Sequence, residues 1–133
     1  MTIEYARYEA ATPDEHGRHK GVFGLVNNLG RAGRLTPEQE RFRRGNNSWY
    51  DAAYTDPSTV DPTVYDPAVN PDAAAWFKPT ATHLFERLPG YLEILDAHGV
   101  AWRRAVSADP GRVVYEDDVQ IVVVPHPSEP HLT

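Results

Sequence analysis

The sequence predicts a single α+β domain in which a small antiparallel sheet with a C-terminal hairpin packs on two or three helices. A capped segment after Thr36 is typical of a helix, and β-branched runs on both sides of Asp117-Asp118 are typical of a hairpin. The chain has 133 residues, of which 41% are hydrophobic, so it can bury one modest core. We expect this domain to span residues 1–125 and residues 126–133 to form a flexible, proline-rich tail.

The first predicted elements are a strand and a segment that has two interpretations. Residues 2–10 alternate in polarity, which predicts a half-exposed strand. In residues 20–30, apolar side chains recur at helical spacing and stop at Gly30, which is typical of a short helix. Two internal glycines weaken that helix, so a strand over the same residues remains an alternative.

The clearest helix start lies at Thr36. Thr36 is a suitable N-cap, Pro37 fits the first helical position and Gln39 completes a capping box. We expect this helix to reach about Tyr54, with a break or kink at residues 45–47, where Gly-Asn-Asn has poor helix propensity.

Residues 56–71, here called the Asp-Pro coil, carry an Asp-Pro pair every five residues, at 56, 61 and 66. Proline removes an amide donor and restricts the preceding residue, so the repeat excludes a regular helix or a central strand. Aspartate in this position accepts a hydrogen bond from its own backbone two residues on, which favours turns. We therefore predict an ordered irregular coil, held on the domain by its apolar side chains, namely Val60, Val64, Tyr65 and Val69.

The second half of the chain predicts two helical segments followed by three strands. Asn70-Pro71 resembles the start of a helix through residues 72–78. An apolar stripe from Thr80 to Leu95 predicts the main core helix, kinked at Pro89. Residues 100–106 alternate as a strand does, and the hairpin follows over residues 112–124.

The charge of the chain limits its partners. Thirteen basic and nineteen acidic residues give a net charge of −6, which disfavours general binding of nucleic acid or of an anionic membrane. The charge is also unevenly placed, because residues 31–44 hold five arginines whereas residues 51–72 hold five aspartates and no basic side chain. Cysteine is absent, and no run of about 18 apolar residues occurs. We expect a soluble cytoplasmic protein that does not bind membranes.

Two residues are candidates for catalysis, and neither belongs to a known reaction motif. His83 precedes the apolar stripe and is a candidate general base, although a histidine bonded to a carbonyl is the commoner structure. Glu116 begins an acidic run that could divide acid and base roles, although adjacent acids at a β-turn are usually solvated. Whether the chain is an enzyme stays open.

No cofactor or metal is predicted. The Asp-Pro coil lacks the glycine and the alternate-residue spacing of a calcium loop. His16 and His19 have a metal-ligand spacing but lie in a loop with no helix to hold them.

Aromatic and basic side chains near the coil are candidates for binding a ligand or a partner. Aromatic groups with polar tips can line a pocket, although core packing is the commoner role. Forked arginine groups can hold a phosphate or carboxylate, although a solvated helix face is the alternative. The candidates are Arg41, Arg44, Trp49, Tyr54, Tyr65 and Trp76.

The stretches NPDAAAWFK and DPGRVVYEDDVQIVVVP are similar to those of a family of small actinobacterial proteins of unassigned function, over residues 22–125. This resemblance implies no activity, cofactor or site. The final strand, turn and strand also resemble the ends of small toxin-type domains, including ADP-ribosyltransferase-like ones. The chain lacks the histidine or arginine strand motif of that family, so no residue role carries over.

Two functional hypotheses follow. The first is a protein-interaction or regulatory module that binds a protein partner through its aromatic and proline-rich surface. The alternative is a small-ligand-binding protein or enzyme, toxin-like or ADP-ribosyltransferase-like, with a pocket near Trp49, Trp76, His83 and Glu116. A flat aromatic patch favours the first hypothesis, and a closed pocket that contains His83 and a carboxylate favours the second.

Overall fold

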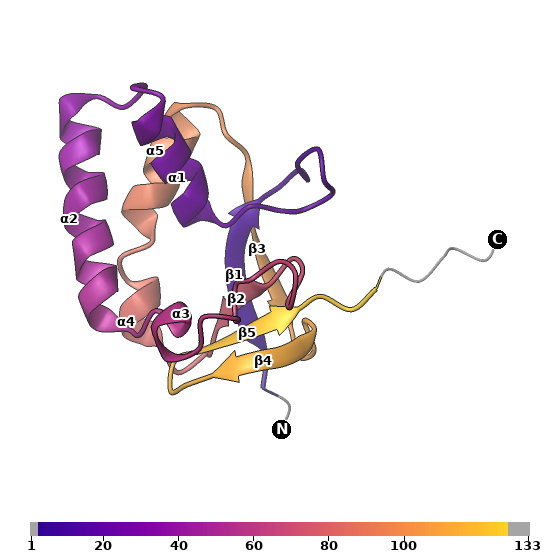
Figure 1. Ribbon diagram of the computed structural model, residues 1–133. Coiled ribbons are helices and arrows are strands. Elements are labelled where there is room, and N and C mark those ends of the chain that lie inside the picture. The colour runs from indigo at the N-terminus through magenta and orange to yellow at the C-terminus, as the bar shows by residue number, and fades with distance from the viewer. Residues whose placement is uncertain (1–2, 128–133) are drawn as a thin grey trace.

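The computed structural model describes residues 3–127, and in it a layer of helices covers one face of a five-stranded antiparallel sheet (Figure 1). This confirms the predicted α+β class. The strands are β1 (Tyr5–Ala10), β2 (Ala74–Phe77), β3 (Trp102–Ser107), β4 (Arg112–Glu116) and β5 (Gln120–Val124). The helices are α1 (Val22–Arg31), α2 (Pro37–Ala53), α3 (Pro57–Val60), α4 (Thr82–Phe85) and α5 (Pro89–Ala97). The predicted tail lies outside the described residues from position 128 onward. Over residues 3–127, no helix has both the length and the apolarity that a membrane crossing requires.

The sheet has the strand order β3-β1-β2-β5-β4, and its shortest strand pairing is the one between β1 and β2. β1 pairs with β3 along its whole length, but β1 and β2 share one residue pair, Ala6 with Phe77. Beyond that pair the returning chain occupies the edge of β1, because Gly21 bridges to Glu9. The Arg7 guanidinium lies in the gap and donates a hydrogen bond to the Ala75 carbonyl oxygen at 3.0 Å. The sheet is therefore two ladders joined at one backbone pair and one arginine.

Residues 22–31 form a helix, which decides between the two interpretations of this segment. Val22 and Val26 are fully buried in the core between the helices and the sheet. Gly21 is the N-cap and lies outside the helix, and the burial of this apolar face outweighs the cost of Gly24, which is about 1 kcal/mol.

The predicted capping box of α2 is confirmed, but the predicted break is wrong. The Gln39 amide donates to Thr36 Oγ1 at 3.1 Å, and the Thr36 amide donates to Gln39 Oε1 at 3.0 Å. α2 then continues without interruption to Ala53. Asn47 stays helical because its side chain donates to Asn27 Oδ1 at 2.8 Å and accepts from the Tyr91 hydroxyl at 2.8 Å. These bonds attach the weak middle of α2 to α1 and α5.

The apolar stripe after Thr80 forms two helices and not one kinked helix. α4 is a single turn, and α5 begins at Pro89. At the first position of a helix the amide has no acceptor, so the proline starts α5 at no cost in hydrogen bonds. The next residue, Gly90, has no side chain, and the Phe42 ring occupies the space that a Cβ atom at this position would need.

The helix predicted over residues 72–78 is wrong, because this segment contains β2. Asp72 has a φ of 60°, which turns the chain, and residues 74–77 then pair with β5. Pairing with a β-branched strand outweighs the helix propensity of three alanines. The Asn70 side chain caps no helix and instead donates to the carbonyl oxygens of Thr63 and Val64, at 2.9 and 3.2 Å.

The Asp-Pro coil is ordered, and the five-residue repeat has a local cause. Each aspartate accepts a hydrogen bond through Oδ1 from the backbone amide two residues on. The distances are 3.0 Å for Asp56, 2.9 Å for Asp61 and 2.9 Å for Asp66. The predicted aspartate turns are therefore confirmed, and the first of them begins the single-turn helix α3.

The contacts that hold the coil differ from those predicted. Val64 is 1% exposed and anchors the coil, together with buried Pro57 and Asn70. Val60 and Val69 are 64% and 52% exposed, so they do not hold the coil on the domain. The turns set the direction of each side chain. Of the valines at 60, 64 and 69, only Val64 therefore points into the core.

Candidate functional site

A cavity of about 460 Å³ lies where the end of α2, the Asp-Pro coil and the strands β2 and β5 meet. We call it the tyrosine cavity. Its lining residues come from segments that are far apart in the sequence. They are Tyr50, Asp51, Tyr54, Asp56, Pro57, Tyr65, Ala75 and Gln120.

The tyrosines of this cavity are placed by the end of α2 and by the coil anchor. Tyr50 lies in the last turn of α2 and Tyr54 is the C-cap residue of that helix, and the Tyr50 hydroxyl donates to the Leu84 carbonyl oxygen at 2.6 Å. The ring of Tyr54 packs edge-on against Phe77, with 5.8 Å between ring centroids. Tyr65 directly follows the buried Val64, so the anchor also positions this ring.

The tyrosine cavity is electrically negative. Burial, together with the charges of Tyr65 and of the neighbouring Asp51, Asp56 and Asp117, raises the pKa of Tyr54 to about 12. Burial also raises the pKa of Tyr65. None of the cavity's lining residues is basic. The phenols are therefore neutral at physiological pH and lie in a field that favours positive charge.

Gln120 lines the same cavity, and its side chain holds a buried acceptor without a donor among the described residues. Its side chain is 0% exposed and donates to the Thr55 carbonyl oxygen at 2.9 Å and to Asp117 Oδ2 at 3.0 Å. Its Oε1 is buried and accepts no hydrogen bond from any group within residues 3–127. An unpaired buried carbonyl oxygen costs about 1–3 kcal/mol, so such atoms usually have a functional or structural explanation.

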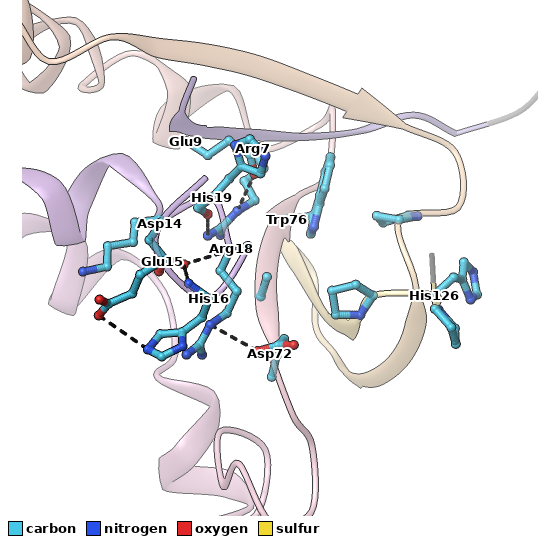
Figure 2. Close-up of a pocket in the computed structure, with 17 residues that line it drawn as sticks. Arg7, Glu9, Asp14, Glu15, His16, Arg18, His19, Asp72, Trp76 and His126 are labelled. Atoms are coloured by element: carbon cyan, nitrogen blue, oxygen red, sulfur yellow. Dashed lines mark hydrogen bonds and ion pairs between the residues drawn. The ribbon is translucent and has the colours of Figure 1, made fainter. Parts of the chain in front are cut away.

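A second hollow, of about 1090 Å³, lies on the sheet face opposite the helices. We call it the outer cleft. Figure 2 shows the loop of residues 14–20, Asp72 and Trp76 of β2, and His126 around its opening, with Arg7 and Glu9 of β1 at its floor. Cross-strand partners share a face, and Trp76 pairs with Ile121, on the opposite side from Phe77 and Gln120. The two cavities are thus on different faces of the sheet.

The floor of the outer cleft is a buried ion network. Glu9 is 5% exposed and accepts hydrogen bonds from Arg7 Nε at 3.0 Å and from Arg103 Nη2 at 2.7 Å. Burial lowers the pKa of Arg7, and the charge of Glu9 opposes this effect. His19 Nδ1 lies 2.8 Å from the Ala10 carbonyl oxygen, so Nδ1 carries the hydrogen and Nε2 is the acceptor. At the rim, Arg18 pairs with Asp72 at 3.2 Å.

The predicted catalytic residues lie apart from each other. His83 is exposed on α4, and its ring meets the Trp49 ring edge-on at 6.4 Å. The Arg87 guanidinium covers Trp49 at 4.3 Å. Glu116 forms an ion pair with Lys78 at 2.6 Å. None of these residues lines either cavity.

The structure brings together part of the predicted binding set. Tyr54 and Tyr65 line the tyrosine cavity, and Trp76 lines the outer cleft. Arg41 and Arg44 are exposed on α2, where Arg44 pairs with Glu40 at 2.9 Å.

No family model, curated protein or solved structure matches the chain. The functional proposals below therefore rest on the structure of this chain alone. Across residues 3–127, no group of three or more histidine, aspartate or glutamate side chains is arranged to hold a metal ion.

Sequence reasoning missed Gln120 and the network of Arg7, Glu9 and His19. A signal for Gln120 exists, because it is the one polar residue in the strand QIVVV, and a polar residue in a buried strand usually makes specific hydrogen bonds. Glu9 carries no such signal, since alternation predicts a solvated face there. Its burial depends on the chain returning at Gly21.

Proposed function

We propose that the protein is an interaction module that binds a basic segment of a partner protein through the Asp-Pro coil and the tyrosine cavity. The observation that carries this proposal is a rigid acidic coil that nevertheless presents apolar side chains to solvent. Its local hydrogen bonds fix the backbone, while Val60, Tyr65 and Val69 are 64%, 41% and 52% exposed. A surface that is ordered before binding loses little conformational entropy when a partner docks.

Charge complementarity decides the chemistry of the partner. Residues 51–72 hold five aspartates and no basic side chain. Asp56, Asp61 and Asp66 each use Oδ1 to close their own turn, and the second carboxylate oxygen makes no hydrogen bond with the described part of the chain. A partner rich in arginine or lysine would meet three preset carboxylates, which favours fast and specific association. The lack of cysteine is compatible with the reducing cytoplasm, where we place this encounter.

A capture experiment with paired variants tests the proposal. The double variant Val60→Ser, Val69→Ser removes apolar contact from the coil, and Val113→Ser removes an exposed valine from β4 as the matched control. A partner held by the native protein and by the control, but lost by the double variant, is then identified by mass spectrometry. A synthetic peptide that spans its basic segment should bind the native protein, and more weakly as salt rises. Equal capture by the three proteins, or a partner without a basic segment, refutes the proposal.

A second candidate function is small-ligand binding, or catalysis, in the outer cleft. It is favoured by His19, whose Nδ1 is fixed on a carbonyl oxygen beside the buried Glu9, which leaves Nε2 able to accept a proton. Trp76 supplies an apolar surface in the same cleft. A thermal-shift screen with nucleotides, NAD and common metabolites tests this function, with Trp76→Leu against Trp49→Leu as control. Stabilisation lost in the first variant alone supports it, and no stabilising compound contradicts it.

A further inference from the structure

We propose that the tyrosine cavity is a binding site for one guanidinium group, that of an arginine side chain in the partner's basic segment. The choice of a protein partner rests on the proposed function above. The choice of a guanidinium group rests on the cavity itself.

The first step of the argument is the set of hydrogen-bond acceptors in the cavity. Gln120 lines the cavity and its buried Oε1 has no donor in the described part of the chain, and Asp51 is an exposed carboxylate on the same lining. Asp56 uses Oδ1 for Ser58, and Oδ2 makes no hydrogen bond within residues 3–127. A ligand that brings several hydrogen-bond donors would match these acceptors. A guanidinium group carries five N–H donors in a planar fork and accepts nothing.

The second step is charge. The carboxylates of Asp51, Asp56 and Asp117 all act on the Tyr54 hydroxyl and favour its neutral form. Arg7 acts on Tyr65 and already pairs with Glu9. Arg87, which acts on Tyr50, covers the Trp49 ring and is not a lining residue. The negative field of the cavity is thus not balanced by the protein's own lining residues, and a cationic ligand would balance it.

The third step is the aromatic lining. Tyr50, Tyr54 and Tyr65 line the cavity, and cations are attracted to the faces of aromatic rings. A guanidinium plane also stacks on tyrosine, whereas an ammonium group is more strongly hydrated and loses more on entering a partly dry cavity. The volume of 460 Å³ lies within the range of small-ligand sites, about 300–1,000 Å³.

Titration of the ¹⁵N-labelled protein with n-butylguanidinium, n-butylammonium and butyrate tests the proposal. We expect n-butylguanidinium to shift the Gln120 side-chain amide signals, n-butylammonium to bind more weakly and butyrate to cause no shift at this site. The variant Asp51→Asn should weaken n-butylguanidinium binding about tenfold or more, as expected when a charged hydrogen-bond partner is lost. Glu93→Gln, an exposed carboxylate on α5, is the matched control and should bind as the native protein does.

Several outcomes overturn the proposal. Equal binding of butyrate or equal affinity for n-butylammonium refutes the guanidinium assignment, as does an Asp51→Asn variant that behaves like Glu93→Gln. N-acetyl-arginine amide separates the two parts of the proposal. Binding of n-butylguanidinium without binding of the arginine amide refutes a protein source for the group. A partner that is lost from the coil double variant, but retained by Asp51→Asn, supports the interaction function and refutes the guanidinium site.

Discussion

The charge of Glu9 stabilises the fold, because its carboxylate is the buried counterion of Arg7. Glu9→Gln keeps the shape of the side chain but leaves the buried guanidinium without an anion. Removing one partner of a buried ion pair costs about 3–5 kcal/mol. We expect a loss of this size in the free energy of unfolding, measured by urea denaturation. Glu93→Gln should be nearly neutral, and equal stability of the two variants would disprove the role given to Glu9.

Gly90 and Gly45 offer a pair of identical substitutions with opposite expected effects. A Cβ atom at Gly90 would overlap the Phe42 ring, so Gly90→Ala should destabilise by about 1–3 kcal/mol through overpacking. Gly45 lies inside α2 with no atom within 4 Å of a new Cβ, so Gly45→Ala should stabilise by up to about 1 kcal/mol through helix propensity. Thermal unfolding of both variants measures this, and a shift of the same sign in each would contradict the packing described for α5.

At the scale of elements, the Asp-Pro coil is the segment whose order depends on single side chains. Asp61 accepts from the Thr63 amide and hydroxyl, and these bonds lower the pKa of its carboxyl. Asp61→Asn retains an acceptor for this turn, whereas Asp61→Ala removes it. We expect faster amide hydrogen exchange at Thr63 and Val64 in Asp61→Ala, and native rates in Asp61→Asn. Identical rates in the two variants would show that the turn is held from elsewhere.

Elements whose local pattern agrees with their distant contacts were predictable from the sequence, as for β1 and β3, and elements where the two conflict were not. The capping box at Thr36 and the aspartate turns involve partners two or three residues away, so their residue types identify them. β2 was predicted as a helix because its alanines favour one locally, and only pairing with β5 makes it a strand. The same limit applies to the sites. Tyr54 and Tyr65 could be named as candidates from their residue type. Gln120 could not, because only the pairing of β5 with β2 places it beside them.

For the whole molecule, buried tyrosines predict a loss of stability in alkali. Burial raises the pKa values of Tyr50 and Tyr91, and burial with nearby acids raises that of Tyr54 to about 12. The unfolded chain releases these protons near the ordinary pKa of 10, before the folded chain does. Stability is therefore complete below pH 10 and falls as the pH rises toward 12.

Urea denaturation at a series of pH values, with tyrosinate absorbance recorded in parallel, measures this loss. The variant Tyr54→Phe removes one of the groups and should make the alkaline fall less steep. A midpoint that stays constant from pH 10 to pH 12 would contradict the burial of these phenols.

The single pair between β1 and β2 gives the molecule a seam. Separation along it breaks the Ala6–Phe77 pair and the Arg7 bond to Ala75, while the β1–β3 ladder and the β2–β5–β4 ladder both stay intact. Partial opening that spares whole ladders costs less than global unfolding. We therefore expect the sheet to open first between β1 and β2, with the Arg7 bond to Ala75 opposing that opening.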